Sequence, residues 1–313
     1  MKEPLFLLYS STPPYHIYEL LKEYNPQRLC SVENLYSCFA EKYREYGIIP
    51  NEENEYKYIA EWRSAMGKLG FIYPEIKRSM GFSQEDLGQL DAITPAGRNL
   101  IAAETVPAIQ ECYLRSMITP TIPVEDGTMF SPLRWVLAIM LELERRGNDT
   151  SISFPEMATI VIRSNPNDGL NETVDSILSL RQQREATERK RIFDRELYDR
   201  KAEEIGMAST TFRDYADMNI RYLKATGMVQ AKGKGITLVP EKHTLAIQLC
   251  NELVSTEPLL EIYRKLCAGS PLPTDNKEMA IEVLRDLLEN AHRYGIQYSL
   301  EGQRLDTPAQ IIH

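Results

Sequence analysis

The feature that most constrains the fold of this sequence is an order of structural signals that occurs twice. In each copy, helix signals are followed by two short strand signals with polar or glycine residues between them. The first copy covers about residues 14–104, and the second covers about residues 131–241. Helices followed by a two-stranded hairpin are the order of elements in a winged helix-turn-helix. The sequence therefore predicts a mainly α fold with small β-hairpins, in which a linker subdomain joins two winged-helix subdomains.

The first copy is defined by an apolar stripe and by its turn residues. Trp62, Met66 and Leu69 recur at helical spacing. Gly70 ends this helix as a left-handed C-cap residue would, and Thr94, which precedes a proline, begins another helix. The predicted elements are helices over residues 17–24, 32–46 and from about 55, with strands at 71–73 and 90–93.

The second copy has clearer caps. Ser131 precedes a proline and begins a helix, Ser153 and Glu156 form a capping box, and Ser209 is predicted to cap a later helix. That later helix buries Phe212 and neighbouring apolar residues. The remaining predicted elements are a long charged helix from about residue 172 into the 190s and strands at 228–231 and 236–239, joined by a basic loop at 232–235.

Proline residues 120 and 123 cannot lie inside a helix, so the stretch before them is predicted to be a linker or spacer. The expected domains are an arm with the first winged helix (1–107), a linker subdomain (108–130), the second winged helix (131–241) and C-terminal helices (242–313).

Composition limits the class of protein. No apolar run approaches the ~20 residues of a membrane helix, and the N-terminus lacks the apolar core of a secretory signal, so we expect a cytoplasmic protein without a membrane partner. Five scattered cysteines without a Cys-x-x-Cys pair make a zinc site improbable. The formal net charge of −9 counts against nucleic-acid binding unless basic groups gather locally.

Two helix faces carry such local patterns. On the helix before each hairpin, polar and basic residues lie opposite the apolar side, as in a helix that enters the major groove. The polar residues near the N-terminus are placed to follow a groove as an extended arm. The candidate DNA-binding residues are Lys2, Ser10, Ser11, Thr12, Tyr15 and His16 in the arm; Tyr56, Lys57, Arg63, Ser64 and Lys68 in the first copy; and Thr210, Arg213, Asp214, Asp217, Arg221, Lys224, Lys232 and Lys234 in the second.

A third basic stretch, from Arg181 to Lys201, interleaves basic and acidic residues. Pairing between residues four apart would solvate such a helix without any ligand, and contact with phosphates is the alternative. Both interpretations stay open at this stage.

Catalytic patterns are weak. A metal-dependent nuclease needs an Asp and a Glu-x-Lys that converge on a divalent cation. Glu75-Ile76-Lys77 follows no suitable Asp, and Asp168 with Glu188 would fall in a loop and on a helical run. We therefore expect no catalytic residue, metal ligand or cofactor in this chain.

Six further segments matter together, namely Leu8–Pro14, Arg63–Phe71, Ile93–Gly97, Ser131–Leu137, Ser179–Glu185 and Asn219–Gly227. In this order they resemble the recognition regions of type IIS restriction and nicking endonucleases, the BpuJI and AlwI-like families and, more distantly, FokI. The order of the segments carries the resemblance more than any one of them does.

This resemblance implies two winged-helix subdomains around a linker subdomain, an N-terminal arm in the major groove, and a separate C-terminal nuclease domain that uses Mg²⁺. The chain ends where that domain would begin, so we expect a monomeric, non-catalytic fragment that recognises a short asymmetric site in double-stranded DNA. The alternatives are a winged-helix transcriptional regulator and a winged-helix scaffold that binds protein.

Overall fold

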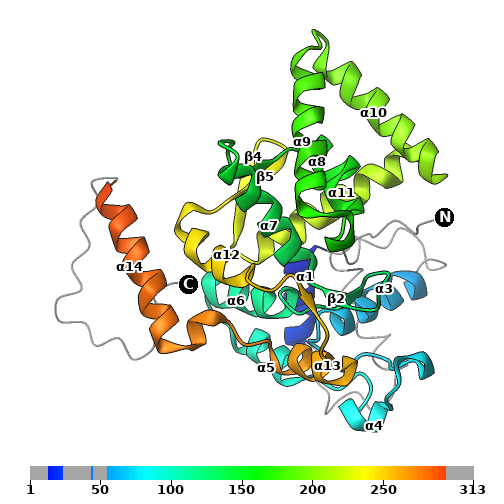
Figure 1. Cartoon of the computed structure of the whole chain (residues 1–313). Helices are drawn as coiled ribbons and strands as arrows, with labels where there is room; N and C mark the ends of the chain where they lie inside the picture. The colour runs from blue at the N-terminus through cyan, green and yellow to red at the C-terminus, as the bar shows by residue number, and fades with distance from the viewer. Residues whose placement is uncertain (1–12, 24–43, 45–54, 294–313) are drawn as a thin grey trace. The chain divides into compact units, whose positions relative to one another are not determined.

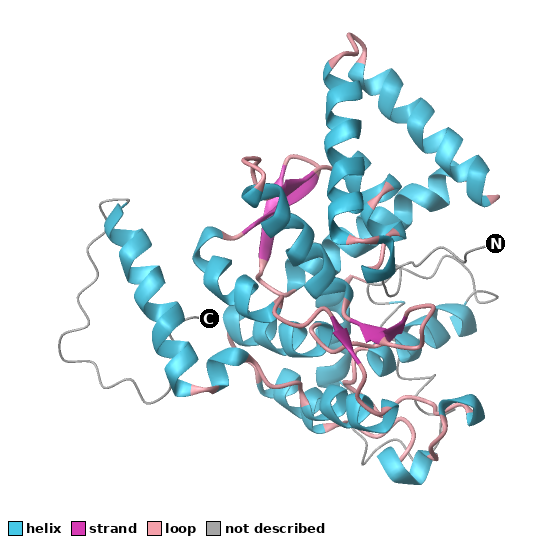
Figure 2. Ribbon diagram, viewed as in Figure 1, coloured by secondary structure: helices cyan, strands magenta, loops and turns pink. Residues whose placement is uncertain are grey.

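The structure is a computed structural model that describes residues 13–23, 44 and 55–293. The chain divides into two compact units. The N-terminal unit contains the described residues up to Thr119 together with the returning segment Glu257–Ser270. The C-terminal unit contains Pro120–Thr256 and the described residues from Pro271 onward. Both units are mainly helical, and the short antiparallel strands of the described residues lie in the C-terminal unit, in keeping with the predicted mainly α fold (Figure 2).

The described N-terminal unit is built from helices with one short bridge between extended segments. Its elements are α1 (Pro14–Glu23), α3 (Glu55–Lys68), a 3₁₀ turn (Arg78–Met80), α4 (Gln84–Leu87), α5 (Pro95–Ala102), α6 (Val106–Met117) and α13 (Leu259–Ala268).

The apolar stripe of α3 forms the core of this unit, as predicted. Trp62, Met66 and Leu69 are fully buried. Phe71, just beyond the helix, packs edge-on against Tyr113 of α6, with ring centroids 5.4 Å apart. Gly97 in α5 lets the backbones approach closely, because an added Cβ would lie 2.0 Å from the carbonyl oxygen of Phe71.

The hairpin of the first copy is shorter than predicted. Its two strand signals meet in a single antiparallel bridge, Ile72 with Ile93. Thr94 caps α5 as expected, since its hydroxyl accepts a hydrogen bond from Gly97 N at 2.9 Å and also donates to Gly70 O at 2.5 Å. The residues that connect the bridge contain α4 and the 3₁₀ turn, so they form a folded loop.

The C-terminal unit contains the remaining elements (Figure 1). They are β1 (Ile122–Pro123), β2 (Met129–Phe130), α7 (Pro132–Arg145), β3 (Ser151–Ile152), α8 (Phe154–Thr159), 3₁₀ turns at Val161–Arg163 and Pro166–Asp168, α9 (Leu170–Glu185), α10 (Lys190–Ile205), α11 (Ser209–Ala225), β4 (Val229–Lys232), β5 (Gly235–Leu238), a 3₁₀ turn (Pro240–Lys242), α12 (His243–Leu249), β6 (Val254–Ser255), a 3₁₀ turn (Pro273–Asp275) and α14 (Lys277–Arg293).

Two small antiparallel sheets lie in this unit. One has the strand order β3-β5-β4, with Ser151 opposite Thr237 and Lys232 opposite Gly235. The other has the order β1-β2-β6. The turn between β4 and β5 is only Gly233-Lys234, and the positive φ of 59° at Gly233 suits a two-residue hairpin turn.

The expected long charged helix is instead two helices, α9 and α10, which form a helical hairpin. The sequence interpretation assumed pairing between residues four apart on one helix. Two of the observed pairs, Arg184 with Asp194 and Lys190 with Glu185, are ten and five residues apart and bridge the turn at residues 186–189, so they form only because the chain reverses. A third, Lys201 with Glu204, lies within α10 at a spacing of three.

Other local expectations need smaller corrections. Ser209 is the first residue of α11 and not its cap, because Ala208 holds the N-cap position and offers no side-chain acceptor. The segment predicted to be a linker or spacer before Pro120 contains α6, which begins at the Thr105 cap, and the linker subdomain stays a prediction. The Ser153–Glu156 capping box is present as predicted.

The predicted helix over residues 32–46 lies outside the described residues except for residue 44. No helix in the part of the chain that the structure describes is long and apolar enough to cross a membrane.

Candidate nucleic-acid interface

Helix α11 presents the clearest candidate face. Its inner side buries Phe212, Ala216 and Leu223, where it packs against α8, α10 and both strands of the hairpin. The predicted outward residues lie on the opposite side. Of these, Thr210, Arg213, Asp214, Arg221 and Lys224 are exposed, and Asp217 is partly exposed. The amphipathic spacing therefore located this face correctly.

Two arginines on the α11 face are held by neighbours. The guanidinium of Arg213 lies over the ring of Tyr198 on α10, 5.7 Å from its centroid. Arg221 forms an ion pair with Asp217 one turn earlier. Burial raises the pKa of Tyr198, so its hydroxyl stays neutral beside Arg213. The face therefore presents cations in defined positions.

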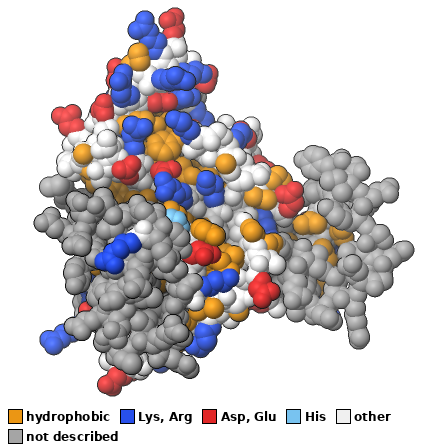
Figure 3. Space-filling view, turned by 180° about the vertical axis from the view of Figure 1, so that it is seen from behind, with side chains coloured by type: hydrophobic (Ala, Val, Ile, Leu, Met, Phe, Trp, Pro, Cys, Tyr) orange, Lys and Arg blue, Asp and Glu red, His pale blue; other side chains and the backbone are white. Residues whose placement is uncertain are grey.

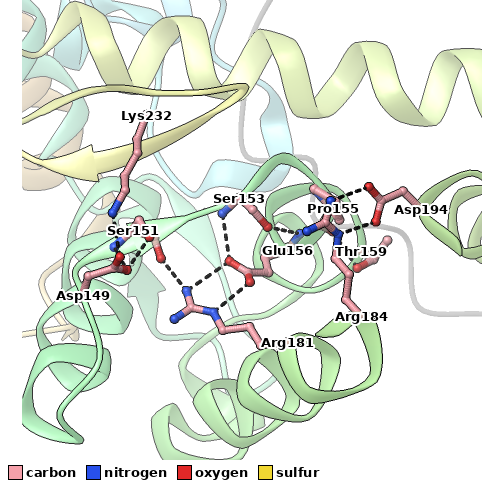
Figure 4. A network of polar contacts seen from close by, with 10 residues as sticks. All are labelled: Asp149, Ser151, Ser153, Pro155, Glu156, Thr159, Arg181, Arg184, Asp194 and Lys232. Carbon is pink, nitrogen blue, oxygen red and sulfur yellow. Dashed lines mark hydrogen bonds and ion pairs between the residues drawn. The ribbon is translucent and has the colours of Figure 1, made fainter. Parts of the chain in front are cut away.

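The β4–β5 hairpin places its two lysines differently. Lys232 Nζ lies 2.6 Å from Asp149 Oδ2, in the residues that lead into β3 (Figure 4). The lysine and the hydrogen bonds from Ser151 lower the pKa of Asp149 to about 2, so this carboxylate is charged at neutral pH. Lys234 lies in the two-residue turn, is exposed, and forms no ion pair with another described residue.

A partly buried ion pair, Arg181 with Glu156, holds the strand next to this hairpin (Figure 4). Arg181 of α9 contacts Glu156 with Nε–Oε1 at 2.8 Å, and it donates to the Ser151 carbonyl at 2.6 Å. Glu156 also accepts from Ser153 N at 2.8 Å, which closes the cap of α8. Arg181 thus joins α9, α8 and β3. The sequence placed it in a basic run, and its role was missed because its partner lies 25 residues away.

The first-copy face is only partly described. On α3, Ser64 and Lys68 are exposed, as expected for an outward face. Arg63 instead contacts Asp91 with Nε–Oδ1 at 2.6 Å, and Asp91 is buried with a positive φ of 63°. Arg63 therefore links α3 to the segment at residues 90–93, which precedes α5. The side chains of Tyr56 and Lys57 lie outside the described residues.

The expected N-terminal arm is also partly outside the description, since Lys2, Ser10, Ser11 and Thr12 are not among the described residues. Tyr15 and His16 belong to α1 and not to an extended arm, because the helix begins at Pro14. Tyr15 is exposed. Burial lowers the pKa of His16, so its imidazole is neutral at pH 7.

The weak metal-site candidates are not brought together. Asp168 accepts hydrogen bonds from Asn165, while Glu188 lies in the turn between α9 and α10. Among the described residues, no group of three His, Cys, Asp or Glu side chains is placed to hold a metal ion.

Comparison with known protein families supplies the deciding observation. A model of the AlwI restriction endonuclease family matches residues 67–312. The chain belongs to the AlwI restriction endonuclease family. The match covers α4 through α14, and thus both the α11 face and the hairpin of this AlwI-family chain.

One solved structure, of pyrene- and phenanthrene-modified DNA in complex with the BpuJ1 endonuclease binding domain, is similar with a TM-score of 0.46 and 10% identity, over 81% of this chain and 90% of that one. No curated protein matches the sequence.

Proposed function

We propose that this AlwI-family chain is a sequence-specific recognition module for double-stranded DNA. The observation that carries the proposal is the α11 face, where Arg213, Arg221 and Lys224 project from a helix packed on a two-stranded hairpin. Restriction endonucleases act at defined DNA sequences, so a member of this family needs such a reading surface. Cations on one helix face supply both phosphate contacts and guanine contacts.

The C-terminal unit is interpreted as a winged helix. The order α7, β3, α8, α11, β4, β5 is that of a helix-turn-helix followed by a wing, with β3 as the third strand of the sheet. In this interpretation α9 and α10 are an insertion between the two helices of the turn, and α11 is the recognition helix.

The reading geometry follows from the size of α11. The major groove is about 12 Å wide and admits one α-helix. Arg213 or Arg221 would donate two hydrogen bonds to a guanine edge, and Lys234 at the tip of the wing would contact a phosphate. Asp214 and Asp217 would accept from cytosine amino groups or orient the arginines.

The α3 face of the N-terminal unit is proposed as a second reader. Ser64 and Lys68 are its exposed members among the described residues. Because α3 and α11 carry different side chains, one chain would read different base pairs with each helix. An asymmetric recognition site follows from that difference.

Selection from randomised duplexes tests the proposal. The full chain is incubated with a random duplex library, and bound DNA is sequenced after several rounds. We expect one short asymmetric motif, with binding that weakens steeply as salt rises. Enrichment of no motif would overturn sequence-specific recognition.

We also propose that cleavage belongs to a separate nuclease domain that uses Mg²⁺. Its test is incubation of this chain with a plasmid that carries the selected motif, with and without Mg²⁺. The plasmid should stay intact in both cases, and Mg²⁺-dependent cutting at the motif would contradict this part of the proposal.

A protein-binding scaffold is the second candidate, favoured by the net charge of −9. A binding assay at low salt distinguishes the protein-binding scaffold from the DNA module, because phosphate contacts are strongest there. Absence of any duplex binding in ~50 mM salt would support the scaffold and overturn the DNA module.

A further inference from the structure

The α9–α10 hairpin carries charges that the proposed recognition faces do not use. It rises from α8 and α11 and ends in the turn at residues 186–189 (Figure 1). Helix α10 has 16 residues, so the turn lies about 24 Å along its axis from its other end, at 1.5 Å per residue.

Part of the basic run in this hairpin is neutralised internally. Arg184 contacts both carboxylate oxygens of Asp194, at 2.8 and 3.0 Å. Lys190 contacts Glu185 at 2.7 Å. These two pairs cross the turn and fix α10 against α9. The tip of the hairpin is therefore a preorganised structure.

Three arginines at the tip take no part in these ion pairs. Arg189, Arg191 and Arg195 are exposed and form no ion pair with another described residue. Over residues 186–195, Glu188 is the one acidic side chain in the described structure without such a pair. Figure 3 shows Lys and Arg side chains at this apex, with Asp and Glu side chains among them.

The acidic groups of α10 without ion pairs follow the three arginines along the helix. Glu196 comes directly after Arg195, and Asp199 and Glu203 are exposed toward the other end, where Arg200 also lies. The charge is therefore divided, with an excess of cations at the tip and of anions toward the base. A helix that needed charge only for solvation would not require this division.

We propose that this tip binds the phosphodiester backbone of duplex DNA outside the base pairs read by α11. The inference rests on the proposed DNA recognition. Duplex DNA carries one negative charge per ~1.7 Å of axis. A guanidinium group can donate two parallel hydrogen bonds to the oxygens of one phosphate. The length of α10 corresponds to about seven base pairs at ~3.4 Å each, so the contact falls in flanking DNA. Because the cross-turn pairs already fix the tip, little conformational entropy is lost on contact.

The experiment compares two duplexes and four proteins. One duplex contains only the selected motif, and the other extends it by about ten base pairs on each side, enough to pass the proposed reach. The proteins are the full wild-type chain, the triple variant Arg189→Gln/Arg191→Gln/Arg195→Gln, the double variant Arg191→Gln/Arg195→Gln, and Arg200→Gln as the control. Arg200 is also exposed on α10 without an ion pair to a described residue, but it lies at the other end. Affinity is measured as a function of salt.

On the long duplex, we expect the triple variant to lose about two to three units of the log–log salt slope, at ~0.9 unit per phosphate contact. On the short duplex, the triple variant and the wild type should have the same slope, and Arg200→Gln should match the wild type on both. The double variant Arg191→Gln/Arg195→Gln should lose about two thirds as much slope, which keeps the test valid if the triple variant unfolds.

An unchanged slope for either folded variant on the long duplex would overturn the tip contact, and so would an equal loss on both duplexes. Wild-type binding with an unaffected tip variant contradicts only this inference. Absence of wild-type binding to any duplex contradicts the proposed function itself.

Discussion

Lys232 and Lys234 show how two similar residues in one hairpin differ once their neighbours are known. The sequence pattern places both among the candidate DNA-binding residues. In the structure, Lys232 lies 2.6 Å from Asp149 and helps to hold β4 beside the residues before β3. Lys234 lies in the turn without an ion pair to another described residue. Lys234 is therefore the stronger candidate for a phosphate contact.

For Lys234→Ala we expect weaker binding to every duplex and a salt slope reduced by about one unit, as loss of one phosphate contact gives. Titration of selected and unrelated duplexes at several salt concentrations measures both. Lys232→Ala is the comparison and should change stability more than slope. A Lys234→Ala slope equal to that of the wild type would show that the turn does not contact DNA.

Arg63 has a structural partner that the sequence did not reveal. We expect Arg63→Ala to destabilise the N-terminal unit by about 1–3 kcal/mol, because it leaves the buried Asp91 carboxylate without this cation. Urea unfolding followed by circular dichroism measures the change. Lys68→Ala, on the exposed side of the same helix, should unfold like the wild type. An Arg63→Ala midpoint equal to the wild-type value would show that the pair contributes nothing.

At the scale of elements, the β4–β5 hairpin depends on one close backbone approach. An added Cβ at Gly235 would lie 2.1 Å from the carbonyl oxygen of Ile152 and 2.8 Å from Ser153 Cα. Because both contacts are to backbone, Gly235→Ala should separate β5 from β3 at a cost of about 1–3 kcal/mol.

The matched control is Gly233→Asn. Its added Cβ meets nothing within 4 Å, and Asn tolerates positive φ, so only a small loss is expected. The melting temperatures of both variants and of the wild type, measured by thermal unfolding, test this difference. Equal melting temperatures for Gly235→Ala and the wild type would contradict the close packing of this sheet.

Glu142 makes the stability of the contact between α7 and α9 depend on pH. Hydrogen bonds from Arg145 and then Arg146 lower the pKa of this carboxyl from 4.5 to about 2. Arg146 continues to Asp175 and Asn171 on α9. A lowered pKa stabilises the fold fully above pH 4.5, and this stabilisation is lost as pH falls toward 2.

Glu142→Gln should therefore be less stable than the wild type at pH 7, by about 1–2 kcal/mol after allowance for the solvent exposure of Arg145. The difference should shrink between pH 4.5 and pH 2. Urea midpoints measured across this range test the sign. A difference that stayed constant with pH would show that the carboxylate charge is not its cause.

Local sequence signals predicted those elements whose cause is local. The caps at Thr94, Ser131 and Ser153 and the amphipathic α11 depend on residues within a few positions, and all are observed. The break between α9 and α10 and the pairs of Arg63 and Arg181 depend on partners 10 to 28 residues away. A charge pattern along one helix cannot show which partner the folded chain brings near.

At the scale of the whole molecule, net charge is a poor guide to the surface. The formal net charge of the chain is −9, yet several acidic side chains form ion pairs within the structure, as in the Glu156–Arg181 and Asp194–Arg184 pairs. The exposed cations of the α11 face and of the α9–α10 tip are local features that the sum conceals.

The central claim is that α11 reads bases, and selection with Arg213→Ala tests it most directly. Wild-type and variant chains are selected in parallel against one randomised duplex library, and the affinity of each is measured on the wild-type motif. We expect the variant to lose preference at one base position and to bind that motif about 1–3 kcal/mol more weakly, as loss of a two-bond guanine contact gives. The same motif and the same affinity for both chains would contradict the assignment of α11 as the recognition helix.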